Sequence, residues 1–261
     1  MKRIFSAIQP TNQLHIGNYI GAIRQWLHIQ NAGSFECYFG IADLHALTTS
    51  SNYEVERMAI DTCYQLIACG LDRKKVFLFR QSKIPSILQV YWRLACITNY
   101  SWLEGMSHLQ QKMQLISEQG QSASVGLFSY PILMAADIVA LRGALIPVGL
   151  DQKQHIEFVR KIVTVANRFY PNACLELPEG IYSTHPKIMS LQDGKEKMSK
   201  SSPNPNSAIY LLDDRKLIES KIAKATTDLY SSIEYNIDKQ PEITNLLCIF
   251  SSLANISIEE L

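Results

Sequence analysis

Short apolar runs and amphipathic stretches alternate along the first 170 residues. Residues 3–9 are mainly apolar and end at Pro10 and a polar turn, which predicts a β-strand. Apolar residues then recur at spacings of three and four over residues 16–27, which predicts a helix running to about Gln30. The same analysis predicts strands at 37–42, 76–79 and 144–148 and helices at 55–69, 87–96, 101–116, 128–141 and 152–169. Such alternation is typical of an α/β fold with a parallel sheet wound with helices.

The pattern changes in the last third of the chain. Residues 193–206 are rich in Lys, Ser, Asn and Pro, which predicts an exposed loop close to a domain boundary. Helical spacing returns at 216–225 and 242–254. We therefore expect two domains, residues 1–188 and residues 189–261, and find no internal repeat.

Composition and charge exclude several classes of protein. Of 261 residues, 47% are hydrophobic and 19% are charged, which excludes a disordered or low-complexity chain. The formal net charge of +1 provides no global attraction to nucleic acid or membrane, so a nucleic-acid contact requires a local patch. The uncharged run at 119–136 contains Gln, Ser, Gly and a proline, and we interpret it as a loop followed by a buried helix rather than a membrane span.

Cysteine usage and the N-terminus bear on the cellular compartment. The six cysteines show no paired metal-ligand spacing and lie mostly among apolar residues, which predicts reduced core residues and no metal ligated by the protein. The first apolar stretch is interrupted at Pro10, far short of an export signal. We therefore expect a cytoplasmic protein.

The first candidate motif, His15-Ile16-Gly17-Asn18, falls at the predicted first turn of a helix directly after the first strand. In a wound α/β sheet this is where exposed backbone N–H groups favour a phosphate. Gly17 leaves space for a base or phosphate to approach the backbone. On its own, this motif is more often a helix start with an incidental histidine and glycine.

The second candidate motif, Lys197-Met198-Ser199-Lys200-Ser201, lies in the predicted polar loop. Lysines on a flexible loop can bind a leaving pyrophosphate more tightly in the transition state than in the ground state. A single loop of this composition is usually solvated surface. Both motifs in this order, each in its expected context, resemble the class I aminoacyl-tRNA synthetases with their HIGH and KMSKS motifs.

A third motif, Gly149-Leu150-Asp151-Gln152, follows the strand predicted at 144–148. A carboxylate at a strand end is suited to accept hydrogen bonds from the two hydroxyls of a ribose, and the segment resembles the ribose-binding GxDQ of the same enzyme class. The alternative is structural, because Asp151 with Gln154 fits a helix capping box.

One face of the helix predicted at 128–141 carries a candidate amino-acid pocket. Tyr130, Met134 and Asp137 stand at i, i+4 and i+7, so they share that face. An aromatic ring, a thioether and an acceptor-only carboxylate suit a flat apolar group with one donor, such as indole. A tyrosine hydroxyl satisfies the same chemistry. The alternative of an ordinary core helix would bury an unpaired carboxylate, which is costly.

Family resemblance favours tryptophan. The blocks at 5–10, 15–22, 134–137 and 147–155 closely resemble those of bacterial tryptophanyl-tRNA synthetases, and the similarity extends from residue 1 to 261. It implies a Rossmann catalytic domain at 1–188, the KMSKS loop with a partial helical anticodon-binding domain at 189–261, and a homodimer. Members of that family continue past Leu261, so the resemblance implies that the C-terminal end is lacking and that this chain charges tRNA poorly.

The resemblance also implies site residues. Those around tryptophan are Phe5, Gln9, Tyr130, Met134, Asp137, Val148 and Gln152. Those around ATP are Gln9, His15, Gly17, Asn18, Gly149, Asp151, Ile188, Lys197, Met198, Ser199, Lys200 and Ser201. Those with catalytic roles are His15, Asn18, Lys112, Lys197, Lys200 and Ser201. Leu150 and Ser202 depart from acidic residues common in the family, and we expect them to tune the site.

The implied reaction has two steps. The carboxylate of L-tryptophan attacks the α-phosphorus of ATP, which brings its own Mg²⁺, and the resulting adenylate is transferred to tRNA(Trp). Three alternatives remain: a tyrosyl enzyme, which a His at position 18 would have favoured; a catalytically silent module that binds tryptophan, nucleotide or RNA; and an NAD-binding domain, disfavoured because no GxGxxG follows the first strand.

Overall fold

The computed structural model describes residues 1–182, 187–200 and 202–261. Contacts group them into two compact units, each built from separate pieces of the chain. The first, here called the sheet unit, holds the described residues of 1–10, 29–63 and 71–183. The second, here called the motif unit, holds those of 11–28, 64–70 and 184–261. The predicted boundary at residue 188 stays a prediction.

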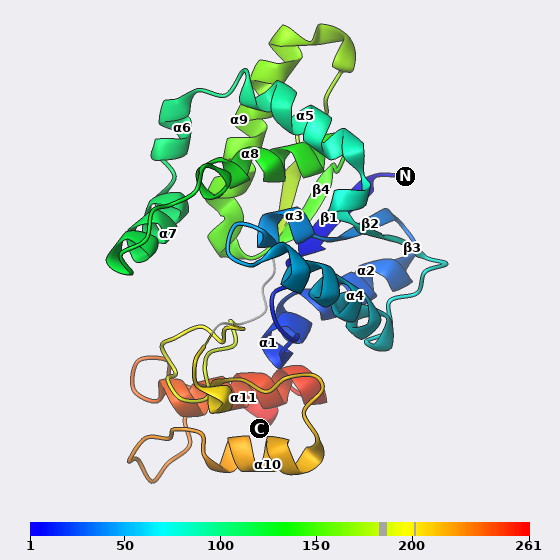
Figure 1. Ribbon diagram of the computed structural model, residues 1–261. Coiled ribbons are helices and arrows are strands. Elements are labelled where there is room, and N and C mark those ends of the chain that lie inside the picture. The colour runs from blue at the N-terminus through cyan, green and yellow to red at the C-terminus, as the bar shows by residue number, and fades with distance from the viewer. Residues whose placement is uncertain (183–186, 201) are drawn as a thin grey trace. The chain divides into compact units, whose positions relative to one another are not determined.

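The sheet unit contains a five-stranded parallel sheet in the order β3-β2-β1-β4-β5 (Figure 1). Its strands are β1 (Arg3–Ile8), β2 (Glu36–Ile41), β3 (Val76–Arg80), β4 (Leu145–Val148) and β5 (Glu179–Tyr182). The parallel α/β class and the first four strands are confirmed. The sequence did not predict β5, which is only four residues long and includes Gly180. Strand order reverses between β1 and β4, and ligands of such folds bind at the carboxyl ends of strands at that switch point.

The helices of the sheet unit follow the predicted order, except that the sequence did not predict α3 and that one predicted helix is broken in two. They are α3 (Asp43–Ala46), α5 (Pro85–Ala95), α6 (Tyr100–Glu104), α7 (Ser107–Glu118), α8 (Val125–Ala140) and α9 (Lys153–Phe169). The single helix predicted at 101–116 is wrong: it is α6 and α7, because Gly105 ends the first and Met106 has an extended backbone. After α7, Ser124 caps α8 by accepting the N–H of Leu127 at 3.1 Å.

A hydrophobic core fixes α8 against the sheet. Phe5 of β1 and Ile146 of β4 pack with Ile87, Ile132 and Val159 from α5, α8 and α9, and all five are buried. Figure 1 shows these three helices together on one side of the strands. Because α8 is held on its apolar side, the side chains on its remaining faces have defined positions beside the ends of the strands.

The motif unit is mainly helical. It contains α1 (Ile16–Asn18), a π-helical turn (Tyr19–Ile23), α10 (Arg215–Ala223) and α11 (Pro241–Ala254). Two helices, α2 (Arg24–Ala32) and α4 (Asn52–Ala68), contribute residues to both units. Gly70 ends α4 with a φ of +110°, a conformation that favours glycine. Short 3₁₀ turns lie at Gln81–Lys83, Leu150–Gln152, Pro171–Ala173, Pro205–Ser207 and Ile258–Glu260.

Two remaining predictions concern the cysteines and the membrane. All six cysteines are free thiols, but placing them all in the core is wrong, because only Cys37 and Cys248 are buried, while Cys96 and Cys174 are exposed. In the part of the chain that the structure describes, no helix is long and apolar enough to cross a membrane.

Candidate active site

Asp137 is the best-connected polar group on α8. Its side chain is buried, and Gln81 Nε2 donates to both carboxylate oxygens, at 2.7 Å to Oδ1 and 3.0 Å to Oδ2. His45 Nε2 lies 3.0 Å from Oδ2. Gln81 follows β3, and His45 is in α3, which follows β2, so both donors come from the carboxyl edge of the sheet. The carboxylate is therefore held among donors and is not an unpaired charge in the core.

Tyr130, Met134 and Asp137 lie in one continuous helix, as predicted. The Tyr130 hydroxyl is 2.8 Å from His155 Nε2, and its ring lies beneath the Lys112 ammonium, 4.5 Å from Nζ to the ring centroid. Burial raises the pKa of Tyr130 to about 12, so its hydroxyl stays protonated at neutral pH. Lys112 has an exposed side chain, yet desolvation at this contact lowers its pKa. The structure thus brings Lys112, predicted to act on phosphate, beside the predicted tryptophan residues.

The other predicted tryptophan residues occupy the same end of the sheet. Met134 and Val148 pack, half-buried, on the core that contains Phe5. Gln9 is exposed directly after β1. Gln152 follows β4 and donates from Nε2 to Asp151 Oδ2 at 3.0 Å. Within the sheet unit, all seven predicted residues therefore lie on β1, α8, β4 or the residues that follow these strands.

Gly149 and Asp151 form a tight turn at the end of β4. A Cβ at Gly149 would lie 2.5 Å from Asp151 Oδ1, so a side chain there would displace the Asp151 carboxylate. The capping-box alternative is wrong for this described segment: Gln152 takes the N-cap position of α9, and the side chain of Gln154 accepts from Ser107 Oγ at 2.8 Å. Asp151 instead stands inside a 3₁₀ turn at the carboxyl edge of the sheet.

In the motif unit, His15 occupies the N-cap position of α1. Its backbone N–H donates to Asn18 Oδ1 at 3.2 Å, so the two motif residues contact one another as their spacing predicts. The residues on either side of His15 pair with a distant segment, because Ile16 N donates to Ile209 O at 2.9 Å and Leu211 N donates to Leu14 O at 2.8 Å. The imidazole is buried, and its Nδ1 has no hydrogen-bond partner among the described residues.

The lysine motif lies beside the histidine motif within this unit. Met198 N donates to Ile188 O at 3.1 Å, which folds residues 188–198 back on themselves, and both side chains are buried. The Cβ position of Gly17 is 3.5 Å from Ile188 Cβ. Asn12 Nδ2 donates to the backbone oxygen of Lys200 at 2.8 Å. Lys197 is exposed, Ser199 and Lys200 are half-buried, and Ser201 lies outside the described residues.

The electrostatics of the motif unit suit an anion. Burial, with help from the positive charges of Lys200 and Lys197, lowers the pKa of His15 to about 4, so the imidazole is neutral at pH 7. Burial lowers the pKa of Lys200 to about 8, so the ammonium is charged at pH 7 but incompletely solvated. A bound phosphate would restore the favourable interactions that this cation loses on burial.

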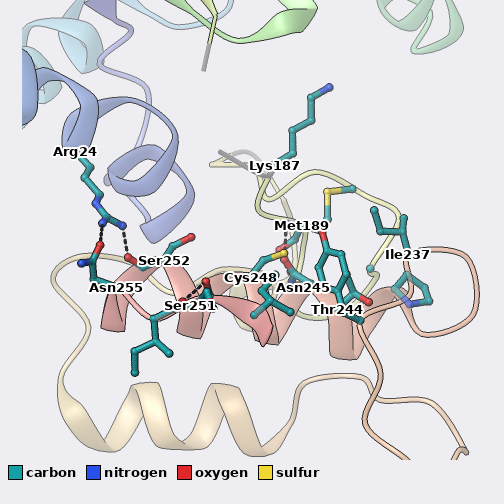
Figure 2. A pocket seen from close by; sticks show the side chains of 16 residues that line it. Arg24, Lys187, Met189, Ile237, Thr244, Asn245, Cys248, Ser251, Ser252 and Asn255 are labelled. Atoms are coloured by element: carbon teal, nitrogen blue, oxygen red, sulfur yellow. Dashed lines mark hydrogen bonds between the residues drawn. The ribbon is translucent and has the colours of Figure 1, made fainter. Parts of the chain in front are cut away.

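A separate cavity of about 730 Å³ opens along α11 in the motif unit (Figure 2). Apolar and polar side chains line it, including Met189, Ile237 and Cys248. At one end the Arg24 guanidinium bonds to the backbone oxygen of Ser252 and to Asn255 Oδ1 (Figure 2). None of the predicted tryptophan or ATP residues that the structure describes lines this cavity, so we do not assign it to either substrate.

Sequence reasoning missed His45 and Gln81. A usable signal existed, because each is a polar residue one to four positions after a strand of a parallel sheet, where ligand-binding groups gather. The sequence indicates His155 only as the last residue of the block at 147–155 that resembles the family, and the structure shows it bonded to Tyr130.

The parallel sheet, its polar switch point and the paired histidine and lysine motifs define the class I aminoacyl-tRNA synthetases. In agreement, the sequence model of the family described as "tRNA synthetases class I (W and Y)" matches residues 1–260. The tryptophan–tRNA ligase of Rickettsia bellii is 41% identical over 262 residues, covering 100% of this chain and 78% of that protein. The chain therefore belongs to the tryptophan–tRNA ligase family.

Solved structures agree with this family. Tryptophanyl-tRNA synthetase from Mycoplasma pneumoniae matches with a TM-score of 0.86 at 32% identity, over 98% of this chain and 74% of that one. The Campylobacter jejuni enzyme, complexed with ADP and tryptophan, matches with a TM-score of 0.78 at 30% identity, over 95% and 74%.

Proposed function

We propose that this chain activates L-tryptophan with MgATP, forming tryptophanyl-adenylate and pyrophosphate, and transfers the tryptophanyl group to tRNA(Trp). In the first step a tryptophan carboxylate oxygen attacks the α-phosphorus, and the bond to the bridging oxygen of pyrophosphate breaks. In the second, a ribose hydroxyl of the terminal adenosine attacks the activated carbonyl and releases AMP. Positioning and charge stabilisation account for catalysis, and no covalent enzyme intermediate is needed.

The observation that carries the proposal is the buried Asp137 carboxylate on the Tyr130/Met134 face of α8. The carboxylate already accepts hydrogen bonds from Gln81 and His45, and it can accept one more from a ligand. Indole offers one N–H on a flat apolar ring. Met134, Phe5 and Val148 supply apolar surface beside it.

The polar end of tryptophan falls to other residues in this proposal. We assign Tyr130, Gln152 and Gln9 to its amino and carboxylate groups. Support comes from their placement after β1 and β4 or on α8. The hydroxyl of Tyr130 is fixed by His155, so it is oriented before the ligand arrives.

For the nucleotide, we assign the ribose to Gly149 and Asp151 and the phosphates to His15, Gly17 and Asn18. Ile188 and Met198 provide buried apolar surface for adenine. The phosphate charge is met by a set of cationic and hydroxyl groups: Lys112, Lys197, Ser199, Lys200 and Ser201. Mg²⁺ enters with ATP, whose phosphates supply its ligands.

We place the reaction in the cytoplasm and in a homodimer. The free thiols support the former. For tRNA, whose contacts are many and individually weak, residues 189–261 are our candidate binding part.

The test is tryptophan-dependent exchange of pyrophosphate into ATP. We expect exchange with tryptophan and at least a hundredfold less with tyrosine at equal concentration. Exchange that is faster with tyrosine would identify a tyrosyl enzyme, and tryptophan binding without exchange would identify a silent module.

A further inference from the structure

Gln81 is a buried glutamine whose whole side chain is committed. It is the first residue after β3 and is 2% exposed. Its Oε1 accepts the backbone N–H groups of Leu44 at 3.1 Å and of His45 at 3.4 Å, at the start of α3. Its Nε2 donates to both oxygens of Asp137. One amide group therefore joins three elements: β3, α3 and α8.

The orientation of this amide follows from the chemistry of its partners. Backbone N–H groups only donate, so the glutamine oxygen must face α3. A carboxylate only accepts, so the glutamine NH₂ must face Asp137. The reverse orientation would oppose donors to donors and acceptors to acceptors. The arrangement has a single satisfied state.

The two oxygens of Asp137 are used unequally. Oδ2 meets both Gln81 Nε2 and His45 Nε2, at 3.0 Å each, whereas Oδ1 meets only Gln81, at 2.7 Å, among the described residues. Each carboxylate oxygen accepts about two hydrogen bonds. The two donors on Oδ2 complete its capacity, so Oδ1 keeps room for one more donor.

We infer that Gln81 is the positioning residue that directs Asp137 Oδ1 to the indole N–H of tryptophan and so sets amino-acid selection. This inference rests on the proposed function of the site. Gln81 does not touch the substrate; it acts by fixing the rotation of the carboxylate that does. The backbone N–H of His45 also bonds to the Gln81 side chain. Gln81 therefore links the orientation of the Asp137 carboxylate to α3, the helix that carries the second donor, His45 Nε2.

A purely structural role would be to fasten α3 to β3. The two roles are separable, because the oxygen of Gln81 serves α3 and the nitrogen serves Asp137. Gln81→Glu keeps an acceptor for α3 and replaces the donor with an acceptor beside Asp137. Gln81→Met keeps the volume and removes both functions. Gln30→Met is the matched control, because Gln30 is also a buried glutamine in the sheet unit, and its Oε1 accepts Asp72 N–H at 3.0 Å.

The first readout compares tryptophan with 3-benzothienylalanine, in which sulfur replaces the ring N–H. The dissociation constant of 3-benzothienylalanine divided by that of tryptophan isolates the contact to that N–H. We expect Gln81→Met to lower the ratio about tenfold, chiefly by weakening tryptophan, as loss of one well-directed bond to a charged acceptor implies. Gln30→Met should leave it unchanged. An unchanged ratio in a folded Gln81→Met protein would overturn the inference.

The second readout is a pH profile of the Gln81→Glu variant, which remains informative where Gln81→Met fails to fold. Two adjacent carboxylates share a proton as pH falls, and the protonated one then donates to the other. Tryptophan affinity of Gln81→Glu, relative to wild type, should therefore rise several-fold from pH 8 to pH 6. A flat relative profile would contradict the positioning role.

Other titratable groups near this pair are present in both proteins, so the relative profile removes their effects. They are His45 on α3, Tyr130 on α8 with His155 on α9, and Asp43, which pairs with Arg80 and bonds to Ser82. Tryptophan-dependent pyrophosphate exchange by the wild-type protein distinguishes failure of the proposed function from failure of the role given to Gln81. No tryptophan-dependent exchange in wild type would refute the proposed function, whereas wild-type exchange with an unaltered Gln81→Met ratio would refute this inference alone.

Discussion

The surroundings of Asp137 and those of Lys200 are opposite solutions to binding. In the sheet unit, the Asp137 carboxylate is buried with two donors already in place. In the motif unit, a half-buried ammonium has its pKa lowered to about 8, and a neutral His15 has its pKa lowered to about 4. The first is a hydrogen-bonded network in which Asp137 Oδ1 can still accept one more donor. The second is a set of basic groups whose pKa values are lowered by burial.

The difference shows how each region uses binding energy. A completed network is rigid, so it distinguishes ligands by small differences in shape and donor placement. A desolvated cation gains most when negative charge develops near it, so it contributes more to a transition state than to the ground state. We therefore expect Asp137 variants to change selection and Lys200 variants to change rate.

The largest expected effect is on Lys200→Met. Removing a charged group that stabilises a leaving group costs about 10²- to 10³-fold in rate, and we expect this loss in adenylate formation with little change in ATP affinity. Single-turnover kinetics over a range of ATP concentrations measure both. Lys195→Met, an exposed lysine of the same loop, is the control. A defect cured by saturating ATP would mean that Lys200 only binds the ground state.

Asp137→Asn should have the next largest effect. The substitution keeps the shape but places neutral amide atoms among Gln81 and His45, so tryptophan kcat/KM should fall about ten- to a hundredfold, as expected for a lost bond to a charged acceptor. The KM for ATP should stay within about twofold, because Asp137 is not among the residues assigned to ATP. Asp61→Asn, at an exposed position, provides the control. Wild-type kinetics in Asp137→Asn would remove Asp137 from substrate recognition.

The pH dependence of ATP use should reveal Lys200. With a pKa of about 8 in the ligand-free protein, the ammonium loses its proton as pH rises from 7 to 9, so kcat/KM for ATP should fall about tenfold across that range. Lys200→Arg keeps its charge and should not show this alkaline limb. An identical limb in both proteins would assign it to another group.

The smallest expected effect is on acid stability in the sheet unit. Burial, then the positive charges of His108 and Lys112, lowers the pKa of His155 to about 4, below the 6.5 of an unfolded histidine. Between these values the unfolded chain binds a proton that the folded one does not, so the free energy of unfolding falls as pH drops from 6.5 toward 4. Urea unfolding should show His155 contributing about 1–2 kcal/mol of this fall between pH 7 and pH 5.

His155→Gln should reduce the slope by that amount, since glutamine does not titrate. The glutamine side chain can still bond to the Tyr130 hydroxyl. The free energy of unfolding of each protein at pH 7 therefore serves as the reference for its own pH dependence. Equal slopes in the two proteins would show that His155 titrates normally when folded.

Several features of both regions could be predicted from the sequence. The period of α8 was enough to place Tyr130, Met134 and Asp137 on one face, because helical spacing depends only on local geometry. The contact of His15 with Asn18 followed from the same rule. By contrast, β5 begins with Glu179 and Gly180, so it lacks the apolar run that marks the equally short β4, and the break at Gly105 depends on one glycine within a helical pattern.

The donors on Asp137 could not be predicted in the same way. Gln81 and Asp137 are separated by 56 residues, and their meeting depends on the order of strands in the sheet. The pKa values of His15 and Lys200 likewise depend on burial by distant segments. Sequence indicated which groups carry chemistry, whereas tertiary structure determines how they are partnered.

In the proposed complex, the partly occupied carboxylate of Asp137 accepts the indole N–H of tryptophan. The most direct measurement is NMR of tryptophan labelled with ¹⁵N at the indole nitrogen and bound to the protein. We predict a downfield indole proton that exchanges slowly with water in wild type, and an upfield shift with faster exchange in Asp137→Asn. A bound indole N–H with the shift and exchange rate of free tryptophan, equal in both proteins, would contradict the account.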